Sequence, residues 1–484
     1  MKGARLLTPA QQAAFERLLP RLLPFADAAS PELPLARLLR LALFQVSVGL
    51  AAALLVGTLN RVMIVELQVA AWLVALMVAL PLLVAPFRAF VGFRSDTHAS
   101  AIGWRRVPYV WMGTLMQFGG LAIMPFALLV LTGDGQLGLA WVGQLCAGLA
   151  FLLVGAGLQT TQTAGLALAT DLSAPAARPR VVALMYVMLL LGMVVGGTVC
   201  SLLLVDFSDT LLVRVVQGAA LLSVLLNFTA VWQQEPRNPN RRRSKDEPAP
   251  RFGPMWRSFI AQPGARRFLW ATALGTAAFN MQDIVLEPYG GEILQLSVGA
   301  TSALTALLAG GSLLAFGLAA RLLSRGGDPL RVAALGAVVG LPAFAAVLLA
   351  APLDAPGLFR GGVLLIGVGA GLFAVGTLTA AMALERADHV GLALGAWGAV
   401  QATAAGSAVA AGGALRDLGG ALAQQGWLGT TLNNPVTGYG LVYHLELGLL
   451  LAALIALGPL TRRLVRHATA PSTAPSFGLA NLPG

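Results

Sequence analysis

A charged, turn-forming stretch interrupts one apolar segment of this 484-residue chain. It reads NMQDIVLEPYGGEIL, and its distinctive residues are Asp283, Glu287, Pro288, Tyr289, Gly290, Gly291 and Glu292. Asp283 and Glu287 are four residues apart, so they share one face of a helix. Two carboxylates on one face can pair with a basic side chain of this chain or of a partner. Pro288 and the glycine pair are expected to end the helix and turn the chain.

The histidines are the next candidates for chemistry, because a neutral imidazole can bind a metal, including the magnesium of a pigment. Three of them, at positions 98, 389 and 467, fall in loops or in the tail, where water is expected to solvate them. His444 instead lies within the apolar stretch GYGLVYHLELGLLL, close to Glu446. It is a candidate axial ligand of a magnesium porphyrin-like ring. The alternative is a hydrogen-bonded histidine at the membrane interface.

Catalytic motifs are absent from the sequence. It contains no nucleophile–base pair, no zinc-ligand spacing and no phosphate-binding loop, and its two cysteines, Cys146 and Cys200, are isolated in apolar segments. We therefore expect neither an enzyme nor a protein metal site.

Composition defines the elements that must position these residues. Hydrophobic residues make up 57% of the chain and charged residues only 11%, whereas soluble domains carry about 25% charged residues. Apolar runs long enough to cross a membrane as helices recur along the chain. The fold class predicted is an all-α, polytopic membrane protein.

Reading the apolar runs between charge or Pro/Gly clusters predicts twelve transmembrane helices. The predicted spans are 38–59, 69–92, 107–131, 139–166, 180–205, 211–232, 267–288, 298–322, 331–351, 358–383, 391–414 and 437–460. Of the 32 Lys and Arg residues, one side of the membrane receives only Arg61, Arg214, Arg360 and Arg416. The positive-inside rule therefore places both termini in the cytoplasm.

The spans group into two six-helix halves, 38–232 and 267–460, joined by a cytoplasmic linker, 233–266. Residues 1–37 form a cytoplasmic segment with a predicted interfacial helix, and residues 461–484 form a cytoplasmic tail. The linker's basic run is expected to rest on anionic lipid headgroups. It has no interleaved aromatic residues, which argues against nucleic-acid binding.

An internal repeat supports two equivalent halves. The pentapeptide VGAGL occurs at 154–158 and again at 368–372. LNRVMIVEL, starting at Leu59, resembles FNMQDIVLEP, starting at Phe279, and this aligns Asn60 with Asn280. Two parallel six-helix repeats are the plan of the major facilitator superfamily.

The loop between spans two and three resembles the signature of that superfamily, G-x-x-x-D-x-x-G-R-R/K. GFRSDTHASAIGWRR retains Gly92, Asp96, Gly103, Arg105 and Arg106. Six residues separate the aspartate from the second glycine where the general pattern has two. This insertion argues against ordinary rocker-switch transport.

Almost no ionisable residue is expected at central depth in the spans. Their interior polar residues are mostly neutral, such as those of the run QTTQT at 159–163. A charged or sugar substrate is therefore not expected, and a hydrophobic ligand or partner fits better.

Three long stretches resemble the PucC/LhaA family of light-harvesting complex assembly and bacteriochlorophyll-delivery proteins. They begin LPFADAASPELPLARLL, LVAPFRAFVGFRSDTHAS and MQDIVLEPYGGEILQLS, and the resemblance covers about residues 20–465. The N-terminal stretch leans to the LhaA-like, core-antenna branch. The resemblance implies a multi-pass protein of the bacterial inner or intracytoplasmic photosynthetic membrane. It also implies antenna polypeptides and the reaction centre as partners, bacteriochlorophyll as ligand, and carotenoid or lipid as further ligands.

In a major-facilitator arrangement, spans one and seven face each other, and Arg61 lies at the depth of the two carboxylates. We therefore predict that Arg61 pairs with Asp283 or Glu287 and closes the periplasmic side; Glu66 is assigned to the same motif. Contact with a basic residue of an antenna polypeptide, or plain solvation, stays open. For the whole protein, the favoured function is an assembly factor for light-harvesting complexes. The alternative is a transporter or flippase of a lipophilic molecule.

Overall fold

A computed structural model describes most of the predicted membrane-embedded chain. The described residues are 33–83, 91, 95, 103–131, 140–174, 177–236, 264–383, 390–427 and 429–467. The predicted interfacial helix in residues 1–37, most of the linker 233–266 and most of the tail 461–484 lie outside these ranges.

All the regular secondary structure in the described residues is helical, because a backbone in hydrocarbon must satisfy its own hydrogen bonds. The first half contains α2 (Leu35–Ala52), η2 (Ala53–Leu59), η3 (Val62–Glu66), α3 (Ala71–Leu83), α5 (Val107–Leu131), α6 (Ala140–Leu172), α7 (Arg178–Leu203) and α8 (Asp209–Val231). The second half contains α10 (Ala265–Met281), η5 (Gln282–Ile284), α11 (Leu286–Glu292), α12 (Val298–Ser324), α13 (Pro329–Ala350), α14 (Pro356–Ala383), α15 (Val390–Gln424), η6 (Thr430–Leu432) and α16 (Val436–His467).

Local signals fix several helix starts. Ser208, Ser297 and Asp328 each accept a backbone N–H from the first turn of the helix that follows, α8, α12 and α13 respectively. Such caps satisfy donors that a helix N-terminus otherwise leaves unpaired. The predicted starts at 211, 298 and 331 lie within a few residues of them.

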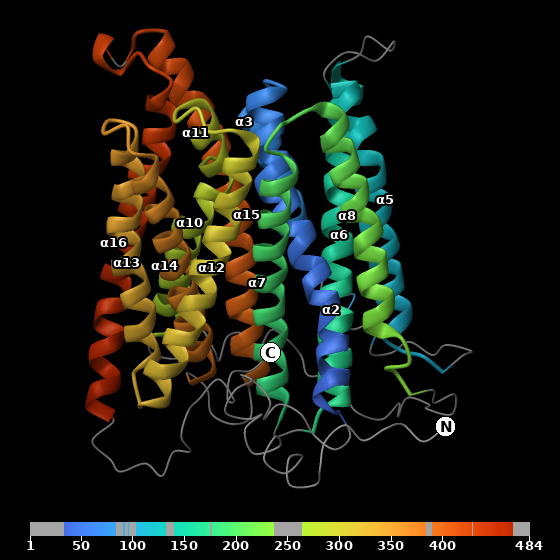
Figure 1. The fold of residues 1–484 in the computed structure, drawn as a ribbon. Coiled ribbons are helices and arrows are strands. Elements are labelled where there is room, and N and C mark those ends of the chain that lie inside the picture. The colour runs from blue at the N-terminus through green and yellow to red at the C-terminus, as the bar shows by residue number, and fades with distance from the viewer. Residues whose placement is uncertain are drawn as a thin grey trace, which may run out of the picture.

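Nine helices in the described residues are long and apolar enough to cross a membrane. The described α3, α10 and α15 occupy the other three predicted spans. An all-helical, multi-pass membrane protein is thus confirmed, whereas the count of twelve spans and the side on which the termini lie stay predictions. The start of α2 and the end of α16 lie at the same end of the bundle (Figure 1).

The two halves stand side by side and meet along a seam formed by α7 with α12 and α3 with α15 (Figure 1). Glycines allow the backbones to approach. A Cβ on Gly197 would lie 2.8 Å from the backbone nitrogen of Ala306, and one on Gly413 would lie 2.6 Å from the carbonyl oxygen of Ala71. Small residues at such crossings are typical of helix packing in membranes.

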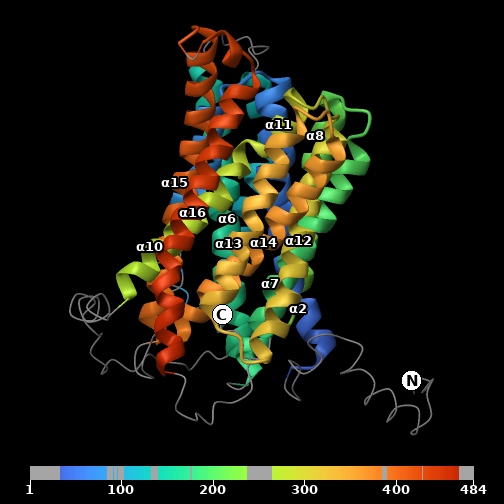
Figure 2. The ribbon, with the colours of Figure 1, turned by 90° about the vertical axis from the view of Figure 1, so that its left-hand side faces the viewer.

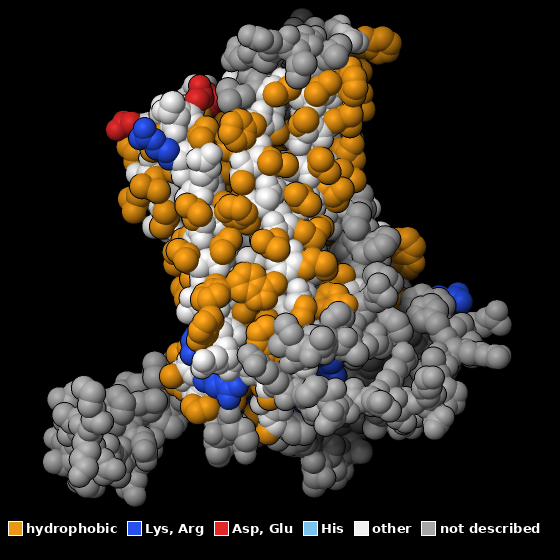
Figure 3. Space-filling model, turned by 90° about the vertical axis from the view of Figure 1, so that its right-hand side faces the viewer, with side chains coloured by type: hydrophobic (Ala, Val, Ile, Leu, Met, Phe, Trp, Pro, Cys, Tyr) orange, Lys and Arg blue, Asp and Glu red, His pale blue; other side chains and the backbone are white. Residues whose placement is uncertain are grey.

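The outer surface is apolar between the two ends of the bundle. Large hydrophobic side chains cover the face in Figure 3, and the lysines and arginines visible there lie near the lower end and the upper left. Leu202 of α7 and Ile455 of α16 are 70% and 73% exposed. This distribution fits a bundle surrounded by lipid. In Figure 2, α13 and α16 of the second half lie towards the viewer, and α2 lies at the lower right.

Candidate functional site

The first and seventh spans, which meet between the two halves, both contain irregular helical segments. The first span changes from α-helix to π-helix over Ala53–Leu59 and again over Val62–Glu66. The seventh is broken by the 3-10 turn Gln282–Ile284. Isolated π-helical turns occur frequently at functional sites, so the seam is the first candidate site.

Polar contacts join the halves at these irregular segments. The Asn60 side-chain amide donates to the carbonyl oxygens of Asp283 at 3.0 Å and Ile284 at 3.2 Å. The hydroxyls of Thr58 and Ser302 lie 2.9 Å apart. The predicted meeting of the two repeated segments is therefore confirmed, and its principal donor is the asparagine that the repeat aligned.

The predicted ion pair of Arg61 with Asp283 or Glu287 is wrong. Arg61 pairs with Glu66 of its own span, and its guanidinium also donates to the Leu296 carbonyl at 3.3 Å. Residues five apart come together here because the intervening backbone is π-helical.

Glu287 is buried instead, and Asp283 is half-buried. Glu287 is only 3% exposed and accepts a hydrogen bond from Thr305 at 2.5 Å. Gly57 of the first span lies against Glu287 and Thr305, so that a Cβ there would overlap both side chains. Asp283 accepts a hydrogen bond from the Gln282 amide. Plain solvation at a helix end is therefore excluded for Glu287 but not for the half-buried Asp283.

The turn also differs from its prediction. Pro288, Gly290 and Gly291 lie inside the short helix α11, and the chain turns after it, at residues 293–297. The proline ring cannot follow a continuous helix because it would clash with the carbonyl four residues earlier, at Ile284. The break therefore comes before Pro288, and Gly291 provides room for the Arg61 guanidinium, whose Nε lies 2.9 Å from a Cβ built there.

Glu292 forms an ion pair that the sequence did not predict. Its carboxylate binds Arg416 of α15 at 2.5 Å and the hydroxyl of Tyr439 at 2.8 Å. The ring of Tyr289 then packs against the rings of Tyr439 and Tyr443, at centroid distances of 5.4 and 5.7 Å. This cluster ties α11 to α15 and α16 within the second half.

The expectation that the spans carry almost no ionisable residue at central depth stays a prediction, but one carboxylate is buried between helices. Glu446 of α16 is fully buried, and neither of its carboxylate oxygens accepts a hydrogen bond within the described part of the chain. Buried intramembrane carboxylates are costly and mark functional regions. The sequence places Glu446 two residues after His444 but does not show that its side chain is buried.

At the opposite end of the first half, Arg105 and Arg106 of the signature loop both bind Asp171, near the end of α6, at 2.5 and 3.0 Å. Gly103 adopts a left-handed backbone conformation, φ 82°. Gly92 and Asp96 lie outside the described residues. The described part of the loop thus joins α5 to α6.

Glu235, just after α8, caps α5. Its carboxylate accepts the backbone N–H groups of Arg105, Arg106 and Val107 at 2.8 to 3.0 Å. A carboxylate suits a helix N-terminus because it satisfies free donors and complements the helix dipole. The turn that carries it is held by Arg37, which donates to the Gln234 carbonyl at 2.7 Å.

Replacing Glu235 with alanine is expected to destabilise the start of α5 by about 1–2 kcal/mol, the usual loss for a helix cap. Amide hydrogen exchange in the peptide containing Arg105 to Val107 should become about tenfold faster. Glu235→Gln keeps one acceptor oxygen, so its loss of stability should be smaller. Unchanged exchange in the alanine variant would show that the cap is not needed.

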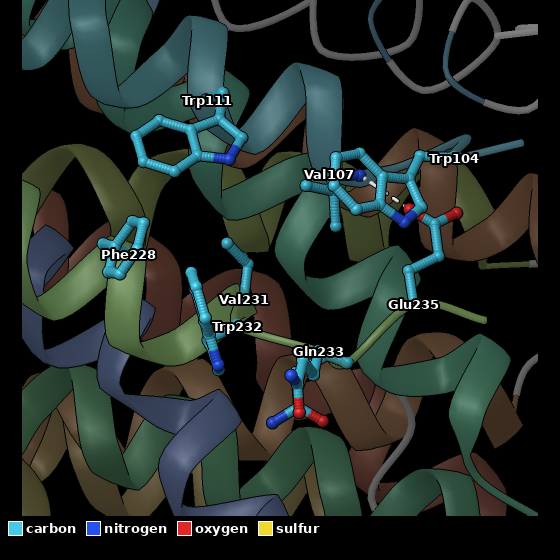
Figure 4. A pocket seen from close by; sticks show the side chains of 9 residues that line it. Trp104, Val107, Trp111, Phe228, Val231, Trp232, Gln233 and Glu235 are labelled. Carbon is cyan, nitrogen blue, oxygen red and sulfur yellow. Dashed lines mark hydrogen bonds between the residues drawn. The ribbon is translucent and has the colours of Figure 1, made fainter. Parts of the chain in front are cut away.

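An aromatic pocket of about 470 Å³ lies beside this cap, between α5 and α8. Its lining residues are Trp104, Val107, Trp111, Phe228, Val231, Trp232, Gln233, Gln234 and Glu235. Figure 4 shows Trp104 and Trp111 on one side and Phe228 and Trp232 on the other. Trp232 is 50% exposed, as expected of an aromatic residue at a membrane–water interface.

A smaller cavity of about 220 Å³ lies between the halves. Tyr186 of α7, Asn280 of α10, Phe316 of α12 and Gln401 of α15 contribute to its wall. Sites for small molecules usually have volumes of about 300–1,000 Å³. This pocket between the halves is smaller than that range.

His444 lies on the outer face of α16 and is exposed. Its Nδ1 is 2.6 Å from the carbonyl oxygen of Gly440. Within the described residues, no group of three or more His, Cys, Asp or Glu side chains could hold a metal ion. Any metal at His444 would therefore have to arrive with its own ligands, as it does in a porphyrin-like ring.

Most of the chain matches one known protein family. Residues 58–465 match the PUCC protein family. The chain belongs to the PucC family. This agrees with the resemblance of the three sequence stretches and does not separate the branches within the family.

Curated relatives extend over most of the PucC-family chain. It is 56% identical to Protein PucC of Rhodovulum sulfidophilum over 402 residues, which are 82% of this chain and 88% of the relative. A protein from the puhA-bchM intergenic region of Rhodobacter capsulatus is 52% identical, over 91% of this chain and 92% of that protein. The bacteriochlorophyll synthase 44.5 kDa chain of Rhodobacter capsulatus is 30% identical, over 79% and 87%.

Solved structures show the fold of this PucC-family protein to be that of major-facilitator-like transporters. A bacterial homologue of the human lysosomal transporter Spinster superimposes with a TM-score of 0.66 at 13% identity, covering 90% of this chain and 98% of that one. A bacterial homologue of the iron transporter ferroportin gives 0.62 at 17% identity, covering 87% and 98%.

Proposed function

We propose that this PucC-family protein is an assembly factor for bacterial light-harvesting complexes rather than an enzyme. It docks on antenna polypeptides and the reaction centre, with the core antenna LH1 and an LhaA-like role favoured, and it holds or delivers bacteriochlorophyll. It works in the inner or intracytoplasmic photosynthetic membrane and has no role with nucleic acid. The family and a relative named for bacteriochlorophyll synthase support this proposal.

The observation that carries the proposal is the contrast between a closely packed seam and an open apolar exterior. The seam is closed by backbone contacts at Gly197 and Gly413, and the pocket described between the halves has a volume of about 220 Å³. The lipid-facing surface carries many exposed large apolar side chains. A hydrophobic pigment or a partner helix can reach that surface directly from the bilayer, without passing through the protein.

The aromatic pocket supports lateral binding as well. Its volume lies within the usual range for ligand sites, and its rings offer stacking surfaces. We assign it to a membrane lipid or a carotenoid, because its exposed tryptophan stands where headgroups meet acyl chains.

Gentle purification from the native membrane, followed by absorption spectroscopy and subunit analysis, tests the proposal. We expect near-infrared bacteriochlorophyll bands together with antenna or reaction-centre polypeptides. A colourless protein without partners would contradict it. Transport of a lipophilic molecule into vesicles, lost when the central cavity is filled by Ala370→Trp, would favour the transporter alternative.

A further inference from the structure

The tautomer of His444 is set by its own helix. A carbonyl oxygen can only accept a hydrogen bond, so the nitrogen 2.6 Å from the Gly440 oxygen must carry the proton. In the neutral ring, Nε2 then keeps its lone pair. This is the arrangement found at metal-binding histidines, whose other nitrogen donates to a carbonyl or carboxylate.

Glycines flank His444 one turn away on each side. Gly440 and Gly448 are spaced four residues before and after it, so all three lie on one helical face. A Cβ built on either glycine would meet no atom within 4 Å. The helix surface four residues before and after the imidazole is therefore open, and the exposed Leu441 and Leu445 lie beside it.

An open surface of this kind suits one class of ligand. The plane of a magnesium tetrapyrrole is roughly perpendicular to the bond between the metal and an axial histidine. The ring therefore extends along the helix on both sides of that histidine. Glycines four residues before and after the histidine leave room for the ring, and the exposed Leu441, three residues before it, offers an apolar contact to the edge of the ring.

Further along α16, the same face of the helix carries exposed apolar side chains. Leu451 and Ile455 are 50% and 73% exposed and lie seven and eleven residues after His444, close to its direction around the helix. A hydrocarbon tail attached to the ring can lie along this surface, which lipid otherwise covers.

We infer that Gly440, His444 and Gly448 form a binding site for one magnesium tetrapyrrole, with His444 Nε2 as the axial ligand. The inference rests on the proposed function and names the site at which the pigment is held. Gly440 and Gly448 are positioning residues, and the rest of the coordination is supplied by the ring itself. Pigment can enter and leave sideways, because nothing in the described residues covers this face.

Binding to the purified full-length chain in detergent tests the site. Bacteriochlorophyll a is added to chain prepared without pigment, and the shift of its absorption band and the magnesium coordination signal in resonance Raman spectra are followed. Bacteriopheophytin a, which lacks the metal, is the parallel probe. We expect the metal-containing ring to bind at least about tenfold more tightly, since even lesser changes around metal ligands alter affinity by 10–100-fold.

His444→Leu should lower the affinity for bacteriochlorophyll a at least about tenfold and remove the histidine coordination signal. Gly448→Phe, which keeps the ligand but fills the open surface, should also lower affinity. Gly361→Phe is the matched control, because a Cβ added at Gly361 of α14 also meets nothing within 4 Å, but no histidine lies beside it in the sequence. Added imidazole should restore coordination in His444→Gly.

Two results would overturn the site. One is equal binding of bacteriochlorophyll a and bacteriopheophytin a, and the other is unchanged affinity in His444→Leu. Either could occur while the native protein still carries pigment and antenna polypeptides, in which case the proposed function stands and only this site fails. Absence of both from the native protein would instead contradict the proposed function.

Discussion

Gly413→Leu is expected to disrupt the packing between the two halves and to destabilise the protein strongly. Even the smaller Gly413→Ala places a methyl group 2.6 Å from the Ala71 carbonyl oxygen and within overlap distance of the Ala75 side chain. Overpacking of this kind costs about 1–3 kcal/mol, and backbone atoms cannot turn away as a side chain can. The midpoint of thermal unfolding should fall in Gly413→Ala and fall further in Gly413→Leu.

Gly420→Ala is the control for this prediction. It lies on the same helix, but a Cβ there meets nothing within 4 Å, so the substitution should be neutral or stabilise by up to about 1 kcal/mol through helix propensity. Gly197→Ala, on the other side of the seam, should behave like Gly413→Ala because it meets the backbone of Ala306. Equal stability of the Gly413 and Gly420 variants would mean that the seam is not closely packed.

The broad fold could be predicted because it follows from averages over many residues. Hydropathy locates helices of about 20 residues without knowledge of their neighbours. The repeats indicated a major-facilitator arrangement, in which spans one and seven face each other, and the hydrogen bonds of the Asn60 amide show how they meet. Hydropathy and internal repeats are local or periodic features, so they can be read from a single sequence.

The partners of individual charges could not be predicted in the same way. Arg61 was assigned across the seam by depth alone, whereas a π-helical backbone brings it to Glu66. The cap on α5 joins Glu235 to residues about 130 positions earlier, a distance over which no sequence pattern acts. The burial of Glu446 likewise depends on how α16 packs against α10, α13 and α15.

The glycines around His444 are a signal that the sequence contains but cannot interpret. GYGLVYHLELG places glycines four residues before and after His444, and helical spacing puts all three on one face. The spacing alone could not show that this face is open to lipid rather than packed against another helix. The structure supplies that information, and with it the direction of the imidazole hydrogen bond.

Removing the Arg61 side chain is also expected to lower the free energy of unfolding strongly. Its guanidinium is buried, binds Glu66, donates to the Leu296 carbonyl and lies against Gly291, so it joins span one to the turn after α11. Breaking a buried ion pair by removing one partner costs about 3–5 kcal/mol. Because Glu66 is 35% exposed and can turn to water, we expect a value near the lower limit, about 3 kcal/mol, for Arg61→Met.

A double-mutant cycle decides which carboxylate Arg61 pairs with. Arg61→Met combined with Glu66→Gln should be less destabilising than the sum of the two, with a coupling of about 1 kcal/mol or more. Arg61→Met combined with Asp283→Asn should be additive within about 0.5 kcal/mol, because these side chains share no hydrogen bond. Thermal or denaturant unfolding of the purified variants measures both cycles. Strong coupling to Asp283 and none to Glu66 would support the ion pair between Arg61 and Asp283. That ion pair, rather than the hydrogen bonds of the Asn60 amide, would then be the main polar contact between spans one and seven.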